Sequence, residues 1–148
     1  MKSTFESRIS TRVKLGYGFA AACWVASLLL PAAEINGSMR LLGYRVFMIG
    51  IDAISAGMPG WFANPLLLAA ILAGLLHRLL LATSLAAVAG VLTLSSFYAP
   101  TLARAKGLPI EAVTFEVGFF LWLGACSMIL ATSLYALVLS RRAKQPAA

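Results

Sequence analysis

Long apolar stretches with charges only at their ends constrain this chain more than any other feature. Between Trp61 and Ala99, only His77 and Arg78 interrupt the apolar and small residues with a basic side chain. A single helix over residues 65–99 would be about 52 Å long at 1.5 Å per residue, whereas the hydrocarbon core of a bilayer is about 30 Å thick. We therefore expect the chain to turn at His77-Arg78 and to form a helical hairpin.

The composition favours lipid as the solvent of these stretches. Hydrophobic residues make up 61% of the 148 residues and charged residues 11%, where a soluble domain carries about 25% charged residues. A soluble protein of this composition could not cover its surface with polar groups. The sequence predicts an all-α membrane protein with one domain over residues 1–148.

Four transmembrane helices in a bundle account for most of the chain, because each needs about 20 apolar residues. We expect the first to be an uncleaved anchor, although its basic start and small residues also resemble a signal peptide. The tail before it is either a short helix on the inner leaflet or solvated. The expected spans cover 15–31, 61–76, 79–99 and 115–139, with outer loops at 32–60 and 100–114 and cytoplasmic tails at 1–14 and 140–148.

Residues 39–57 are apolar enough for a fifth span, but they contain Arg45 and Asp52. With four spans, eight Lys and Arg residues lie inside and four outside, whereas five spans give six inside and five outside. Basic residues favour the cytoplasmic side, and burying Arg45 in lipid would cost at least about 2.5 kcal/mol. We therefore expect cytoplasmic termini and an outer-face helix over 39–57, either interfacial or re-entrant.

Two stripes distinguish this outer helix. Gly43, Gly50 and Gly57 recur every seven residues, which suits close docking onto the bundle. Arg45 and Asp52 share another stripe but lie about 10 Å apart along the axis, too far to pair directly. They are either solvated groups of an interfacial helix or a polar spot that binds a partner, a lipid headgroup or a substrate.

The run Trp61-Phe62-Ala63-Asn64-Pro65 predicts the start of the second span. Trp61 suits the interface, Asn64 can cap a helix, and Pro65 fits a first helical position. Asn64 is also a candidate for recognition if its side chain faces inward.

The last span offers two further candidates. Glu116 near its start is expected as a carboxylate at a helix N-terminus, or as a proton- or cation-responsive group if it points into the bundle. Trp122 lies deeper, and its indole N–H needs an acceptor, for which Ser127 or a backbone carbonyl is available.

Small residues recur at four-residue spacing in every expected span, which allows close helix packing in lipid. The interpretation is an intramolecular bundle, with homo-oligomer or partner contacts as alternatives. These residues are Gly18, Ala22 and Ala26; Ala70 and Gly74; Ala82, Ala86 and Gly90; and Ser127 and Ala131.

The runs GYRVFMIGIDAISAGMPGWFANPLLL and GFFLWLGACSM resemble small uncharacterised bacterial inner-membrane proteins with a W-[FY]-A-N-P helix start and a G-x-x-L-W element in the last span. The resemblance implies the bacterial inner membrane and no particular activity. The matching positions are Gly43, Gly50, Trp61, Ala63, Asn64, Pro65, Gly118 and Trp122.

The sequence lacks the usual signatures of catalysis and cofactor binding. It contains no P-loop, G-x-G-x-x-G, H-E-x-x-H or G-x-S-x-G motif. Cys23 and Cys126 are far apart in sequence, and the one histidine has no neighbouring ligands, so we expect no metal, cofactor or disulfide. No folded basic face is predicted for nucleic acid.

We therefore expect a non-catalytic accessory, regulatory or immunity-type membrane protein. Its expected partners are membrane lipids and either another membrane protein or further copies of the chain. The alternatives are a small transporter or pore formed by oligomerisation, and a lipid-modifying enzyme with a site near the outer leaflet. The candidate binding residues are Arg45, Asp52, Trp61, Asn64 and Glu116.

Overall fold

The computed structural model describes residues 2–55, 59–98 and 112–144, and the side chains of 11–50, 59–98 and 112–142. Most of this part of the chain is helical, as expected, but a small sheet is also present, so the all-α class is corrected. In chain order, the elements are α1 (Lys2–Leu29), β1 (Pro31–Ile35), β2 (Met39–Leu42), α2 (Gly43–Ser55), the 3-10 helix η1 (Pro59–Phe62), α3 (Ala63–Leu75), α4 (Leu79–Ser95), the 3-10 helix η2 (Ser96–Tyr98), β3 (Val113–Phe115) and α6 (Val117–Lys144).

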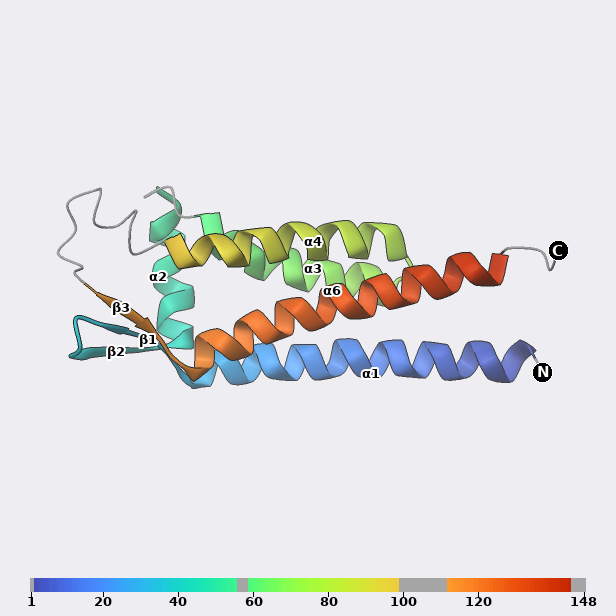
Figure 1. The fold of residues 1–148 in the computed structure, drawn as a ribbon, viewed down its shortest axis with the longest axis horizontal. Helices are drawn as coiled ribbons and strands as arrows, with labels where there is room; N and C mark the ends of the chain where they lie inside the picture. Colours follow the sequence, from blue (N-terminus) through green and yellow to red (C-terminus); the bar gives the residue numbers. More distant parts are fainter. Residues whose placement is uncertain (1, 56–58, 99–111, 145–148) are drawn as a thin grey trace.

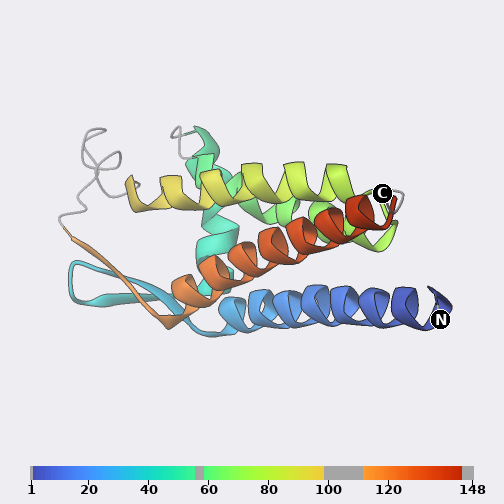
Figure 2. The ribbon, with the colours of Figure 1, turned by 45° about the vertical axis from the view of Figure 1, so that its right-hand side comes forward.

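Four helices form an elongated bundle, and the remaining helix lies across one end of it. Helices α1, α3, α4 and α6 run along the long axis, with both termini and the α3–α4 turn at the same end (Figure 1). The second view shows α2 crossing the opposite end, with the sheet extending beyond it (Figure 2). Most of the basic residues are therefore at one end of the bundle and α2 at the other.

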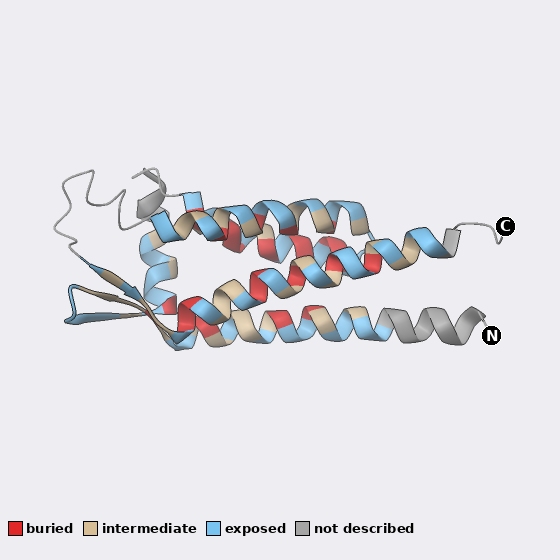
Figure 3. Cartoon of the chain, in the orientation of Figure 1, coloured by how far each residue is buried: buried red, intermediate tan, exposed pale blue. Residues whose placement is uncertain are grey.

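The bundle core consists largely of small side chains. Buried residues from all four helices meet in one cluster, which includes Ala20, Ala70, Ala86 and Cys126. The sides of the helices that face one another are buried and the outer sides are exposed (Figure 3). Large apolar side chains occupy those outer sides, for example Leu72, which is 59% exposed.

The packing confirms the expected small-residue stripes in α3 and α4 but not in α1 and α6. Ala70, Gly74, Ala82 and Ala86 are buried. In contrast, Gly18 and Ala22 of α1 and Ser127 and Ala131 of α6 are exposed. Another face of each helix is turned inward: Tyr17 of α1 and Ser133 of α6 are both fully buried, and their hydroxyls hydrogen-bond at 2.9 Å.

The predicted hairpin turn at His77-Arg78 is confirmed. His77 takes a left-handed conformation with φ of 61°. Its N–H donates to the carbonyl of Gly74 and the N–H of Arg78 donates to the carbonyl of Ala73. This is the paired hydrogen-bond pattern that ends many helices, with histidine where glycine is usual.

Several expected boundaries shift. Helix α1 begins at Lys2, so residues 2–14 continue the first helix and do not form a separate helix. The last helix, α6, starts at Val117 rather than 115 and continues to Lys144. The second begins as the 3-10 turn η1 and becomes α-helical only at Ala63.

A three-stranded antiparallel sheet replaces part of the two expected outer loops. Its order is β2-β1-β3, and Glu34 of β1 stands opposite Arg40 of β2 and Thr114 of β3. The turn between β1 and β2 contains Asn36 and Gly37, both with positive φ. An Asn-Gly pair is a strong hairpin signal because both central residues of this turn are left-handed. The predicted helix over 39–57 therefore begins only at Gly43.

In the described part of the chain, two segments are long and apolar enough to cross a membrane, Leu79–Tyr98 and Val117–Arg142, while the apolar helical segment Pro59–Leu75 is shorter. Helix α2 has 13 residues and would be about 20 Å long, which is too short for a bilayer core of about 30 Å. Helix α3 also has 13 residues, but it runs along the bundle axis, whereas α2 crosses the end of the bundle; the orientation therefore distinguishes α2 from the bundle helices (Figure 1).

The expected docking of α2 through its glycines is confirmed at two positions. A Cβ atom on Gly43 would collide with the backbone carbonyl of Ser27 in α1, and one on Gly50 would collide with the indole of Trp61. Gly57 lies outside the described residues. Gly18, by contrast, has open space where its Cβ would be.

We predict opposite effects for two glycine-to-alanine substitutions. Gly43→Ala should lower the free energy of unfolding by about 1–3 kcal/mol, because the Ser27 backbone cannot move aside easily. Gly18→Ala should raise it by about 0.5–1 kcal/mol, since alanine is the better helix former. Thermal unfolding in detergent micelles, followed by circular dichroism, measures both. Equal stability of Gly43→Ala and the parent chain would contradict the docking described for α2.

Candidate functional site: an apolar cavity beneath α2

A cavity of about 290 Å³ lies where α2 crosses the end of the bundle. The ends of all four bundle helices contribute to its wall, through residues such as Ser27 of α1, Asn64 of α3, Ser95 of α4 and Trp122 of α6. Helix α2, η1 and strands β1 and β3 complete it. The lining is predominantly aliphatic and aromatic, which is typical of sites for apolar ligands.

Asn64 ties together the helices around this cavity. Its side-chain oxygen accepts hydrogen bonds from the indole Nε1 atoms of Trp24 in α1, at 3.0 Å, and of Trp122 in α6, at 2.9 Å. Its Nδ2 donates to the carbonyl of Trp61 at 3.2 Å. Because Asn64 is only 7% exposed, these bonds satisfy polar groups that burial would otherwise leave unpaired.

Trp61 joins α2 to this network. Its Nε1 donates to the backbone carbonyl of Phe47 at 2.8 Å. The ring of Phe47 packs against the rings of both Trp61 and Trp24, with centroids 5.7 and 6.4 Å apart. A side chain from the start of the second bundle helix thus holds α2 over the cavity.

A second aromatic group stands on the α6 side of the cavity. Phe115 and Phe119 stack with their centroids 4.1 Å apart, and Phe97 of η2 contacts both rings edge-on. Phe119 also contacts Trp122 at 5.7 Å. Asn64 bridges the two aromatic groups through Trp24 and Trp122, so aromatic residues surround this end of the bundle.

The structure corrects three expectations about these residues. The helix cap of α3 is Phe62, and no side chain bonds to it, so Asn64 does not cap the helix but faces inward. Pro65 lies in the first turn, two residues after the helix starts. The acceptor for the Trp122 indole is Asn64, whereas the Ser127 hydroxyl donates to the carbonyl of Leu123 in its own helix.

Glu116 lies beside the sheet rather than inside the bundle. Its Oε1 is 3.3 Å from the Nε of Arg40, and the same Nε donates to Oε2 of Glu34 at 3.1 Å. The hydrogen bond to Glu34 and the charge of Glu116 raise the pKa of the Arg40 guanidinium, which therefore stays protonated. The backbone of Glu116 caps α6, since its carbonyl accepts from the N–H groups of Phe119 and Phe120.

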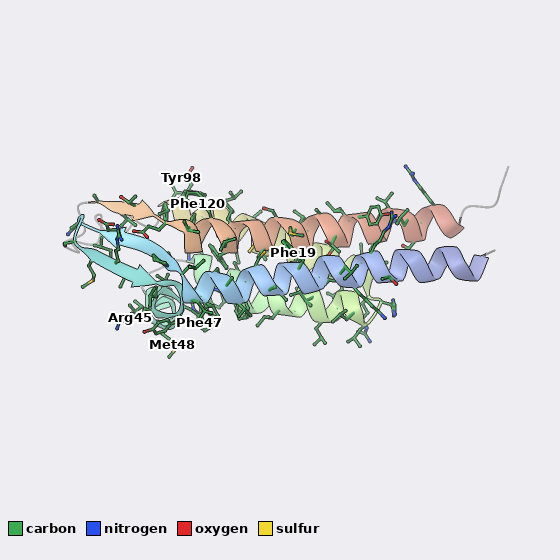
Figure 4. The ribbon with its side chains drawn as sticks, turned by 90° about the horizontal axis from the view of Figure 1, so that it is seen from below. Phe19, Arg45, Phe47, Met48, Tyr98 and Phe120 are labelled. Carbon is green, nitrogen blue, oxygen red and sulfur yellow. The ribbon has the colours of Figure 1, made fainter. Side chains whose placement is uncertain are left out.

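Arg45 lies apart from Glu116 and Asn64. It is exposed on the side of α2 that faces away from the four bundle helices, as is Met48 (Figure 4). Its Nε donates to the Tyr44 hydroxyl at 3.2 Å. Asp52 falls within the range of α2, but its side chain lies outside the described residues. Of the four candidate residues whose side chains the structure describes, it brings Trp61 and Asn64 together at the cavity.

Sequence reasoning missed Trp24, Phe47 and Arg40. Trp24 lies near the outer end of the first span, and an interfacial tryptophan there is a signal for a polar partner at the same depth. Arg40 could have been paired with Glu34 by folding the chain at Asn36-Gly37. No simple signal identifies Phe47, because the group that Trp61 contacts is its backbone carbonyl.

Comparisons with known proteins do not extend these assignments. No model of a protein family matches the chain. Searches of curated proteins and of solved structures also returned no match.

We predict that Asn64→Leu will destabilise the fold strongly. The substitution keeps the approximate size of the side chain but leaves the indole N–H groups of Trp24 and Trp122 without their acceptor. Each unsatisfied buried donor costs about 1–3 kcal/mol, so the expected loss in the free energy of unfolding is about 2–5 kcal/mol. Unfolding in micelles, monitored by tryptophan fluorescence, measures this loss.

Ser127→Ala is the matched control, because its exposed hydroxyl bonds only within its own helix. It should change the free energy of unfolding by less than about 0.5 kcal/mol. A loss for Asn64→Leu no larger than the control's would show that Asn64 does not hold the helices together.

Proposed function

We propose that this chain is an integral protein of the bacterial inner membrane with four transmembrane helices and cytoplasmic termini. We further propose that it acts without catalysis, as an accessory, regulatory or immunity-type partner of another membrane protein. The observation that carries the proposal is that the buried polar side chains of the described spans are already engaged in internal hydrogen bonds, while α2 leaves a mixed apolar and cationic face exposed.

Three features support the membrane assignment. Two segments have the length and hydropathy of spanning helices. All four bundle helices contribute to one core, so α1 and α3 pack beside those two segments. Small side chains are buried and large apolar ones are exposed, which suits helices packed in lipid.

The positions of the termini support the proposed orientation. The N-terminus, the turn with Arg78 and the C-terminus with Arg141 and Arg142 share one end of the bundle (Figure 1). Lysine and arginine near the ends of spans favour the cytoplasmic side. Helix α2 and the sheet would then lie at the outer surface.

The buried polar groups inside the bundle are engaged in packing. Tyr17 bonds to Ser133, and the Thr93 hydroxyl donates to the Ala89 carbonyl and contacts the Cys126 sulfur at 3.3 Å. No buried side-chain nitrogen or oxygen lacks a partner in the described part of the chain. A single copy therefore offers no polar path for a solute, which favours the partner proposal over a transporter or pore.

The carboxylates also favour a structural role over lipid-modifying catalysis. Glu34 and Glu116 both contact Arg40, which links β1, β2 and the residue before α6. Among the described residues, no three His, Cys, Asp or Glu side chains gather where they could hold a metal ion.

The outer face of α2 is the best candidate for the partner interface. It exposes Tyr44, Arg45 and Met48 next to one another, and tyrosine, arginine and methionine are enriched in protein interfaces. We expect Arg45→Glu and Met48→Ser to remove a co-purifying membrane protein that the parent chain, tagged and produced at its natural abundance, retains in mild detergent.

Phe19→Ala is the control for this experiment. Phe19 is 60% exposed on α1 and lies away from α2 (Figure 4), so its loss should not affect partner binding. Purification of the parent chain as a lone monomer would contradict the proposal, as would solute flux through liposomes that contain only this protein.

A further inference from the structure

We infer that the cavity beneath α2 binds one hydrocarbon chain of an anionic phospholipid, with the phosphate headgroup at its mouth near Arg45. This inference rests on the proposed function, because a phospholipid reaches this end of the bundle only if the helices cross a membrane. The acyl chain would lie on the inner side of α2, while Arg45, on the outer side, belongs to the proposed partner interface as well.

The chemistry of the wall selects an apolar occupant. The polar side chains that α1, η1, α3, α4 and α6 contribute to the cavity already have partners: Asn64 accepts from two indoles, Trp61 donates to Phe47, and the Ser27 and Ser95 hydroxyls donate to backbone carbonyls one turn earlier. Apart from the Ser96 hydroxyl of η2, the rest of the wall that the helices build is aliphatic and aromatic. A polar ligand would lose its hydrogen bonds to water without gaining equivalent bonds from the wall. A hydrocarbon chain makes no hydrogen bonds to water and therefore loses none.

The size of the cavity fits part of one lipid chain. An apolar cavity of about 150 Å³ holds benzene, and the cavity here has about 290 Å³. This is room for a segment of a single hydrocarbon chain but not for a whole phospholipid. The headgroup must therefore remain outside.

The mouth of the cavity opens beside α2. Val46 and Ile49 line the cavity and are also 40% and 53% exposed, so the wall is open where they stand. Arg45 precedes Val46, is fully exposed to solvent, and contacts no carboxylate among the side chains that the structure describes. Arg40, the other arginine that the structure describes at this end, is engaged by two glutamates. Of these two described arginines, Arg45 is thus the one available to a phosphate.

The chain carries its own probe for this site. Of its three tryptophans, Trp61 and Trp122 line the cavity, and Trp24 bonds to the same Asn64 oxygen as Trp122. Bromine atoms on an acyl chain quench tryptophan fluorescence on contact. Phosphatidylglycerol with brominated acyl chains, titrated into the full chain in detergent micelles, should quench the emission saturably with a stoichiometry of one.

Two variants that fill the cavity test the position of the acyl chain. Val46→Phe and, independently, Ala33→Leu should weaken binding about tenfold or more, because the added side-chain atoms take the space of the ligand. Met48→Phe is the matched control on the same helix, since Met48 is 62% exposed and does not line the cavity. The Met48→Phe variant should bind the brominated lipid with the same affinity as the parent chain.

Headgroup recognition is tested separately. Arg45→Gln should weaken the binding of brominated phosphatidylglycerol about two- to fivefold and leave the binding of brominated phosphatidylcholine unchanged. Equal binding of phosphatidylglycerol, phosphatidylcholine and a brominated fatty acid, with no effect of Arg45→Gln, would overturn the assignment to an anionic phospholipid.

Quenching that never saturates would overturn the site itself. So would equal quenching in the Val46→Phe variant, the Met48→Phe variant and the parent chain. That result would not touch the partner proposal, because the titration uses the isolated protein. Conversely, a lone monomer in the co-purification experiment would refute the partner proposal and leave the lipid site standing.

Discussion

The side-chain oxygen of Asn64 is the acceptor on which the end of the bundle that α2 crosses depends. Helix packing within the bundle relies on small residues and short-range contacts, which hold helices in lipid but do not fix their depth relative to one another. Two indole N–H groups, from α1 and α6, converge on one oxygen of α3. Trp61, next to the same helix start, holds the backbone of α2. Four segments that are distant in sequence are thus held at the same position along the bundle axis, and the apolar cavity lies among them.

The sequence predicted the features that depend on local pattern. The turn at His77-Arg78 follows from the length of the apolar stretch around it, and the docking of α2 follows from the spacing of Gly43 and Gly50. The predictions that were wrong concerned contacts between residues that are distant in sequence. Which face of α1 and α6 is buried is decided by Tyr17 and Ser133, 116 residues apart, and not by the regular spacing of small residues in either helix. The acceptor of Trp122 lies 58 residues away, on another helix.

The sheet shows a different kind of failure, because its signal was present and local. Asn36-Gly37 between short apolar segments predicts a hairpin. The long apolar stretches on both sides instead favoured a loop followed by a longer helix. The consequence for the site is concrete. The hairpin brings Arg40 to Glu34 and Glu116, so that the guanidinium is engaged there, and of the two arginines described at this end only Arg45 has no contact with a described carboxylate.

The proposals together require that the bundle crosses the bilayer with α2 and the sheet on the outer side. Enzyme reporters test this most directly: alkaline phosphatase, which is active only after export, can be inserted at Gly37 in the exposed β1–β2 turn or fused after Lys144. The account predicts activity for the insertion at Gly37 and none for the fusion after Lys144. Activity after Lys144, or its absence at Gly37 in a correctly inserted chain, would contradict the topology and the surfaces assigned from it.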